Sequence, residues 1–227
     1  MGITPAETLD DIIARRVAFL TAYQNAAHAR RYADRVAVLR AAEARAVPGS
    51  TAVSEAAAKN LFKLMAVKDE YEVARLYTDG TFAADIARQF QSYEKLEFHL
   101  APPILGRRGY DGKPRKSSFG PWMMKAFRLL AAMKGLRGTA FDLFGHTAER
   151  RAERQMLAQY EADLDLIATA LAPGRIDAAA ALACVPALVR GYGHVRQASA
   201  AKAAQERSRL LQRLTQTVPM PVLSAAE

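Results

Sequence analysis

The sequence predicts a mainly α-helical protein of about six to seven helices with a small β-hairpin insertion. Good helix formers, above all Ala, Leu, Arg and Glu, dominate the composition, and β-branched residues are sparse. Apolar residues recur at three- and four-residue steps over most of the chain, and one short stretch follows a two-residue rhythm. With 227 residues and a hydrophobic fraction of 51%, the chain can bury a core.

The N-terminal segment, residues 1–48, is predicted to be one long helix or two helices in line. Residues 4–7 have the form of a capping box with proline at the first helical position. Leu9 and Ile13 then begin an apolar stripe with helical spacing. Pro48, which is followed by a glycine, should end this segment.

Residues 49–216 are predicted to form a helical domain that contains the hairpin near 95–119. Its first helix should begin after Thr51 and end at about Tyr77, and a shorter helix should follow around 82–90.

The hairpin is expected where the periodicity of the sequence changes. Leu96, Phe98 and Leu100 alternate with polar residues, as in a half-buried strand. Residues 106–116 should form a loop, and residues 116–119 can return as the partner strand.

The remaining helices are expected at 122–134, 147–171, 176–190 and 195–214. The first of them is strongly apolar, so we expect a central and mostly buried element. Pro186 should interrupt the third. Two further prolines should keep residues 217–227 a flexible tail.

The composition restricts the classes of partner and site. A formal net charge of +9 predicts attraction to an acidic partner, whether nucleic acid, an acidic protein or an anionic cofactor. The single cysteine, Cys184, excludes an internal disulfide and a four-thiolate site made by this chain alone, and we interpret it as a small buried residue. No stretch approaches the roughly 20 apolar residues that span a bilayer, and the N-terminus lacks a leader pattern. We therefore expect a cytoplasmic protein without a membrane partner.

Signatures of catalytic and cofactor sites are missing from the sequence. It has no GxGxxG motif after a strand, no Walker loop and no ferredoxin-type cysteine spacing. It also lacks the Gly-Asp-Gly and paired asparagines that would hold magnesium and thiamine diphosphate. His28, His99, His146 and His194 lie in different segments, so no helix carries a two-histidine metal face. We expect no metal site and no cofactor bound by this chain alone, and we assign no catalytic residue.

The first candidate site is a strip of charged residues within the apolar side of the helix predicted to end near Tyr77. It comprises Lys68, Asp69, Glu72 and Arg75. One interpretation is a set of half-exposed pairs within the helix, each worth a few tenths of a kcal/mol. The other is a partly buried polar network at a domain interface or near an active site that another domain contributes.

The second candidate site is the loop at 106–116, which carries five positive charges against one negative. Its basic residues are Arg107, Arg108, Lys113, Arg115 and Lys116. They form either a binding site for an anion or an acidic partner, or a solvated hairpin tip. We do not expect nucleic acid, because interleaved aromatic residues, a helix-turn-helix pattern and zinc-finger spacing are lacking. The aromatic residues Trp122, Phe127, Phe141 and Phe144 are expected in the core rather than in a substrate pocket.

Three stretches resemble the C-terminal region of bacterial fused indolepyruvate ferredoxin oxidoreductases. They are Lys63–Thr78, Phe98–Pro103 and, above all, Arg115–Arg151. The last contains Lys-Ser-Ser-Phe-Gly-Pro-Trp-Met, Gly-Leu-Arg-Gly-Thr-Ala-Phe-Asp and Gly-His-Thr-Ala-Glu-Arg-Arg, and is rich in low-frequency residues. The similarity extends from Ala18–Gln24 to Gly191–Val195, which is most of the chain.

The resemblance implies a place beside catalytic domains of the 2-oxoacid oxidoreductase type. The complete enzyme would oxidatively decarboxylate an aryl pyruvate with coenzyme A, in aromatic amino acid degradation, to give an aryl-acetyl-CoA, carbon dioxide and reduced ferredoxin. Thiamine diphosphate, magnesium and iron–sulfur clusters are expected in those partner domains or subunits.

This chain is then an accessory module without activity of its own. It is either a working subunit or a truncated product of a once-fused gene, with the catalytic domains and ferredoxin as partners. The alternative is a stand-alone basic helical adaptor that binds nucleic acid or an acidic protein such as ferredoxin.

Overall fold

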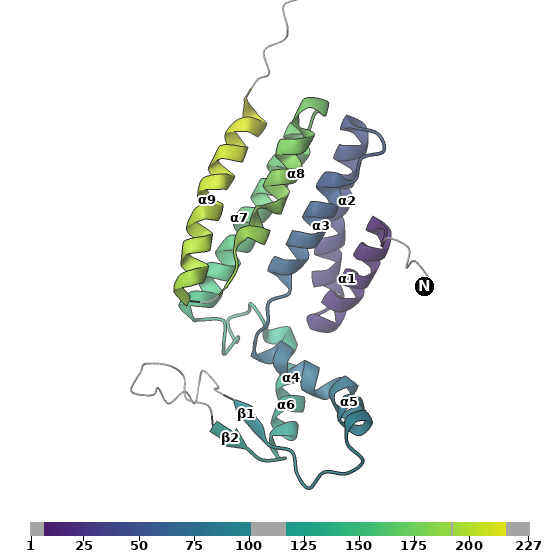
Figure 1. Ribbon diagram of the computed structural model, residues 1–227, viewed down its shortest axis with the longest axis vertical. Coiled ribbons are helices and arrows are strands. Elements are labelled where there is room, and N and C mark those ends of the chain that lie inside the picture. Colours follow the sequence, from purple (N-terminus) through teal and green to yellow (C-terminus); the bar gives the residue numbers. More distant parts are fainter. Residues whose placement is uncertain (1–6, 101–116, 192, 217–227) are drawn as a thin grey trace, which may run out of the picture. The chain divides into compact units, whose positions relative to one another are not determined.

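The computed structural model describes residues 7–100, 117–191 and 193–216, which form nine α-helices, three short 3-10 helices and a two-stranded sheet (Figure 1). The predicted mainly α-helical class with a small hairpin is confirmed, although the helices outnumber the expected six to seven. The chain folds as two compact units that alternate along the sequence. Unit 1 comprises Met1–Ala18, Ala29–Met65 and Gln155–Glu227, and unit 2 comprises Phe19–His28 and Ala66–Arg154. Neither unit coincides with the predicted division at residues 48 and 49.

Helices α1 (Leu9–Tyr23) and α2 (Ala26–Ala46) replace the predicted N-terminal long helix. Asn25 separates them, because its side-chain oxygen accepts the backbone N–H of His28 at 2.8 Å, as a helix N-cap does. Arg40 donates two hydrogen bonds to Asp10, so α1 and α2 run antiparallel. The expectation of one helix, or of two in line, is therefore wrong.

Helices α3 (Ala52–Met65) and α4 (Glu70–Thr78) divide the helix that was expected to continue to Tyr77. Asp69 has an extended backbone and accepts the N–H of Glu72 at 2.8 Å, which makes it the N-cap of α4. Lys68 therefore precedes the helix, and the prediction that it shares a helical stripe with Arg75 is wrong.

The next elements belong to unit 2 and follow the predicted order. They are α5 (Thr81–Gln89), β1 (Phe98–Leu100), β2 (Ser117–Phe119), α6 (Met123–Ala132) and the 3-10 helix η1 (Met133–Leu136). The two strands pair antiparallel with Phe98 opposite Phe119. This pairing confirms the hairpin.

The last elements are α7 (Ala148–Ala170), η2 (Pro173–Arg175), α8 (Ile176–Cys184), η3 (Val185–Leu188) and α9 (Gly193–Thr215). Thr147 caps α7 by accepting the N–H of Arg150 at 3.2 Å. Pro186 lies in η3, so the predicted interruption there is confirmed. The predicted flexible tail, 217–227, lies outside the described residues.

Unit 1 has an aliphatic core contributed by α2, α3, α7, α8 and α9. The side chains that are at most 1% exposed include Leu39, Leu61, Leu164, Leu182 and Leu214. Figure 1 shows α8 running beside α3 and α9. Buried alanines in α3 and α8, such as Ala57 and Ala179, allow the two helices to approach closely.

Acidic residues of α7 tie the helices of unit 1 together. The pairs are Glu161–Arg31 and Asp165–Arg35 toward α2, and Asp163–Arg207 toward α9. Helix α7 is therefore joined by ion pairs to α2 on one side and to α9 on another.

Unit 2 has a smaller core, which is built mainly from aromatic rings. Tyr77 stacks on Phe127 with ring centroids 4.9 Å apart and meets Phe82 and Phe98 edge-on at 4.9 and 5.4 Å. Ala74 of α4 is buried in the same cluster. These contacts pack α4, α5, β1 and α6 together.

Several large apolar side chains lie outside these cores. Trp122 is 59% exposed and Phe141 is 76% exposed, so their expected place in the core is wrong, whereas Phe127 is buried. The outer side of α6 is likewise exposed, contrary to the expectation of a mostly buried helix. Cys184 is exposed as well. In the described part of the chain, no helix is long and apolar enough to cross a membrane.

Candidate functional site

A buried ion pair at the centre of unit 2 joins Arg137, directly after η1, to Asp69, the N-cap of α4. Nε of Arg137 donates to one carboxylate oxygen of Asp69 at 2.5 Å, and Nη2 donates to the other at 2.9 Å. The two side chains are only 11% and 6% exposed. Since the pair is bidentate and largely removed from water, it fixes the orientation of the guanidinium.

The third nitrogen of the guanidinium and its flat face contact aromatic residues. Nη1 of Arg137 donates to the backbone oxygen of Tyr23 at 2.6 Å, and the guanidinium carbon lies 3.7 Å from the centre of the Tyr23 ring. The ring of Tyr71 is 5.4 Å away. With Asp69 and Asp142, these residues form what we call the Arg137 cluster.

Both tyrosines of the Arg137 cluster are held in the protonated form. Burial raises the pKa of Tyr71 to about 12, and the neighbouring carboxylate of Asp142 adds to the shift. Burial also raises the pKa of Tyr23 well above its ordinary value, although Arg137 opposes the shift. The hydroxyl of Tyr23 donates to the backbone oxygen of Val67 at 3.1 Å. Neither phenol is therefore available as a base near neutral pH.

Asp142 organises the loop that follows Arg137. Its carboxylate accepts the N–H of Gly138 at 2.8 Å, the N–H of Phe144 at 3.2 Å and the hydroxyl of Tyr71 at 3.2 Å. Gly138 has φ +77°, which favours glycine. A Cβ on Gly145 would lie 2.5 Å from the Asp142 carboxylate, so this close approach also requires glycine.

The loop presents two apolar side chains to solvent. Phe141 and Leu143 flank the buried Asp142 and are both exposed. Phe144 instead turns inward and meets the ring of Tyr71 edge-on at 5.2 Å. We call residues 138–145 the Asp142 loop. Its two outward side chains are carried by a backbone that is hydrogen-bonded to the buried Asp142 carboxylate.

Three residues of the predicted charged strip lie in or beside the Arg137 cluster. Asp69 and Glu72 are buried, and Arg75 donates two hydrogen bonds to Glu72 at 2.8 and 2.7 Å. Lys68 is exposed, and its backbone oxygen accepts from Arg150 at 3.4 Å. Glu72–Arg75 is a pair within one helix, and Asp69 belongs to a buried network within unit 2, while a role of the strip at an interface with another domain stays a prediction. The residues of the basic loop, Arg107, Arg108, Lys113, Arg115 and Lys116, lie outside the described residues.

The charged groups of the Arg137 cluster are committed to one another. Asp69 and Asp142 accept hydrogen bonds from backbone and side-chain donors within unit 2, and the guanidinium is bound on its edge and on its face. Among the described residues, no group of three or more His, Cys, Asp or Glu side chains could hold a metal ion. The arrangement is suited to fixing a loop rather than to transferring a proton.

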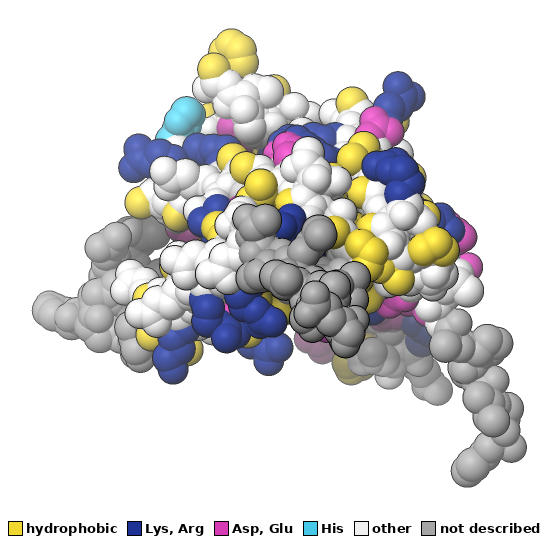
Figure 2. All heavy atoms as spheres, turned by 90° about the horizontal axis from the view of Figure 1, so that it is seen from above, with side chains coloured by type: hydrophobic (Ala, Val, Ile, Leu, Met, Phe, Trp, Pro, Cys, Tyr) yellow, Lys and Arg dark blue, Asp and Glu magenta, His cyan; other side chains and the backbone are white. Residues whose placement is uncertain are grey.

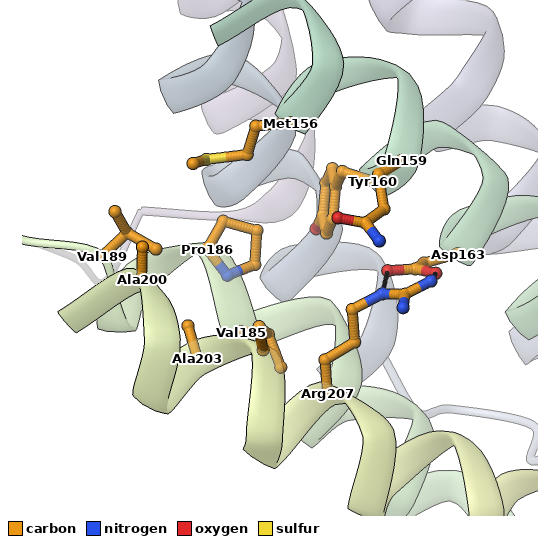
Figure 3. Close-up of a pocket in the computed structure, with 11 residues that line it drawn as sticks. Met156, Gln159, Tyr160, Asp163, Val185, Pro186, Val189, Ala200, Ala203 and Arg207 are labelled. Atoms are coloured by element: carbon orange, nitrogen blue, oxygen red, sulfur yellow. Dashed lines mark hydrogen bonds and ion pairs between the residues drawn. The ribbon is translucent and has the colours of Figure 1, made fainter. Parts of the chain in front are cut away.

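A separate pocket lies in unit 1 between α7, η3 and α9 (Figure 3). Its volume is about 90 Å³, whereas small-molecule sites usually measure roughly 300–1,000 Å³. In Figure 3, Asp163 and Arg207 face each other on the side away from Met156, and Arg207 donates two hydrogen bonds to Asp163 at 2.7 and 2.6 Å. The hydroxyl of Tyr160 donates to a backbone oxygen. Because these polar groups of the wall are satisfied by the chain itself, the pocket is a packing gap between helices.

The surface in Figure 2 bears basic side chains in separate groups, with apolar and uncharged side chains between them. A continuous basic stripe is the usual footprint of a nucleic-acid backbone. On the face shown, the distribution differs from such a stripe.

Residues 9–209 match the model of a family of unknown function, DUF6537. The chain belongs to this family. The matched range of DUF6537 includes the whole Arg137 cluster and parts of both units. No curated protein and no solved structure matches the chain.

Sequence reasoning missed the central residues of this DUF6537 chain. Arg137 carried a usable signal, since it is a lone charge between Gly135 and Gly138 in an apolar region. Asp142 carried another, because it is a single acid between the apolar residues Phe141 and Leu143. For Tyr23, no local signal distinguishes it from the other tyrosines.

Proposed function

We propose that this chain is an accessory helical module of an indolepyruvate-type, aryl-pyruvate:ferredoxin oxidoreductase. It docks on the domains or chains that carry out the CoA-dependent oxidative decarboxylation. The enzyme class rests on the resemblance of Lys63–Thr78 and Arg115–Arg151 to that family. The accessory role rests on the Arg137 cluster, whose charged groups are used to hold the Asp142 loop.

The single observation that carries the docking role is the outward pair Phe141 and Leu143. Large apolar side chains that are exposed together often mark an interaction site. Asp142 holds the backbone between them with three hydrogen bonds, so little conformational freedom remains to be lost on binding. The loop lies within the stretch that carries the strongest resemblance, which connects the proposed surface to the proposed partners.

In this proposal the cofactors belong to the partners. Thiamine diphosphate, magnesium and iron–sulfur clusters would be held by the catalytic domains, and this chain would contribute surface and rigidity. Ferredoxin would be a partner of the assembled enzyme.

The test is to purify the tagged full chain from its native cytoplasm, identify bound chains by mass spectrometry and assay the preparation. We expect thiamine-diphosphate and iron–sulfur chains, together with aryl-pyruvate- and CoA-dependent reduction of a ferredoxin substitute. Recovery of the chain without such partners and without this activity would overturn the proposal.

Variants of the loop test the surface itself. Phe141→Ser with Leu143→Ser should reduce recovery of the catalytic chains about tenfold or more, because an interface anchor is typically worth more than 1 kcal/mol. Val38→Ser is the matched control, since Val38 is an exposed apolar residue of unit 1. Equal recovery with the loop variant and the control would remove the Asp142 loop from the interface.

A further inference from the structure

Helix α6 has one side in the core of unit 2 and one side in solvent. Met123 and Phe127 are buried against Ala74 and Phe98. The opposite side carries four exposed residues: Trp122, Lys125, Arg128 and Leu129. We call these four the α6 outer face.

The residues of the α6 outer face share a surface because of their helical spacing. Trp122, Lys125 and Leu129 are three, four and seven residues apart, so they follow one another along one side of the helix. Arg128 lies next to Leu129. The ring of Trp122 meets Phe119 of β2 edge-on at 6.0 Å, which anchors it to the hairpin.

Lys125 and Arg128, the two cations of this face, have no acidic partner among the described residues. Helix α6 itself contains no Asp or Glu. Two other arginines of unit 2 do have acidic partners, since Arg75 pairs with Glu72 and Arg137 with Asp69. The α6 outer face therefore combines large exposed apolar side chains with two cations that pair with no acid in the described part of the chain.

We propose that the α6 outer face is a docking site for an acidic protein surface in which Asp and Glu surround an apolar centre. Trp and Arg are the side chains most enriched among interface anchors. The two cations would pair with the acidic groups, and Trp122 and Leu129 would be covered by the apolar centre.

Two other kinds of partner fit this face less well. Two basic residues on a short helix are too few for stable attachment to an anionic membrane. A nucleic-acid backbone would leave Leu129 without an apolar contact. The site is distinct from the Asp142 loop, so it does not depend on the proposed function.

The single tryptophan of the chain is Trp122, and it reports directly on this site. The probe is a synthetic helical peptide with Glu on one side and Leu on the other, free of Trp and Tyr, titrated into the full chain at low salt. We expect a saturable blue shift of the emission and protection of Trp122 from acrylamide quenching. Added salt should weaken the binding, because the charges are exposed.

The decisive variant is Lys125→Glu with Arg128→Glu, which should weaken peptide binding about tenfold or more. The control is Arg30→Glu with Lys202→Glu, which makes the same change of net charge at exposed residues of unit 1. The control should bind within about twofold of the original chain. Far-UV circular dichroism checks that both variants are folded.

Three results would overturn the proposal. They are an unchanged Trp122 emission, an equal loss with the control pair, and a shift caused by phosphatidylglycerol vesicles but not by the peptide. The variant Phe141→Ser with Leu143→Ser should still bind the peptide. That result separates this site from the docking loop of the proposed oxidoreductase module.

Discussion

The two units place their large apolar side chains differently. Unit 1 buries most of them and leaves only Val38, Leu188 and Val195 exposed among the large apolar residues that the structure describes there. Unit 2 exposes Leu76, Phe90, Tyr93, Trp122, Leu129, Phe141 and Leu143. Among the described residues, unit 2 therefore exposes more large apolar side chains than unit 1 does.

The two units also differ in what their ion pairs connect. In unit 1, ion pairs such as Asp163–Arg207 join one helix to another. In unit 2, the pair Asp69–Arg137 joins a helix N-cap to the segment that begins the Asp142 loop. Unit 1 therefore has the character of a scaffold, whereas unit 2 uses its buried charges to hold a surface.

The largest loss of stability is expected when the buried ion pair of unit 2 is removed. Asp69→Ala leaves the guanidinium of Arg137 buried without its partner and removes the N-cap of α4, so it should lower the free energy of unfolding by about 4 kcal/mol. Urea unfolding followed by the fluorescence of Trp122, which lies in unit 2, measures the change.

The control for this variant is Glu206→Ala, which breaks the exposed pair Arg209–Glu206 of α9. Its effect on the free energy of unfolding should be small, because exposed ion pairs contribute little to stability. An unchanged fluorescence midpoint for Asp69→Ala would mean that the buried pair does not hold unit 2.

The corresponding change in unit 1 is Glu43→Ala. The Glu43 carboxylate is fully buried and accepts hydrogen bonds from Ser50, from the backbone of Val53, and from the backbone and side chain of Ser54. Its removal leaves buried donors at the start of α3 unsatisfied, so the free energy of unfolding should fall by about 3 kcal/mol. Far-UV circular dichroism should report the loss. Glu55→Ala, at a more exposed acid of α3, is the control.

Acid should abolish the contribution of Glu43. Burial opposes ionisation, but the hydrogen bonds from the two serines and the backbone outweigh it and hold the pKa of Glu43 below its ordinary value. A lowered folded-state pKa gives stability that is present above the unfolded pKa of about 4.3 and is lost as the pH falls through the folded value. The stability difference between the original chain and Glu43→Gln should stay constant from about pH 7 to 5 and shrink below about pH 4. A difference that is still full at the most acidic pH at which the chain folds would contradict this.

A smaller effect is expected at the tightest backbone approach of unit 2. Gly145→Ala places a methyl group against the Asp142 carboxylate, which three hydrogen bonds hold in place, so it should cost about 2 kcal/mol. Gly135→Ala is the matched control, since a Cβ there meets nothing within 4 Å. Its effect should lie within about 0.5 kcal/mol. Equal stability of the two variants in thermal unfolding would show that the Asp142 loop is not fixed as described.

Local sequence patterns predicted most elements but not the breaks between neighbouring helices. Apolar residues continue on both sides of Asn25 and Asp69, and the side chain of each caps the start of a new helix. Such a cap depends on a single polar residue, whereas hydrophobic periodicity is judged over many residues and does not show where a helix begins or ends. The hairpin was predictable because the alternation of residues 96–100 differs from everything around it.

The candidate site was only half predictable. Asp69 and Glu72 were identified because charges stand out within an apolar stripe. Arg137, the partner of Asp69, lies 68 residues beyond it, and the backbone oxygen of Tyr23 that Arg137 contacts is 114 residues before Arg137. Contacts of this range arise from tertiary packing, which no single-sequence pattern encodes. The exposure of Trp122 and Phe141 escaped prediction for the same reason, because aromatic residues at helical spacing also suit a core.

The interleaving of the two units along the chain sets an order for synthesis on the ribosome. Every segment of unit 2 has been made once Arg154 has emerged, whereas unit 1 still awaits α8, α9 and most of α7. Leu210 and Leu214, which are buried in the core of unit 1, arrive last. Until then the apolar sides of α2 and α3 lie uncovered on the nascent chain and are natural ligands for a chaperone. Unit 2 can therefore be fully synthesised before unit 1 is complete.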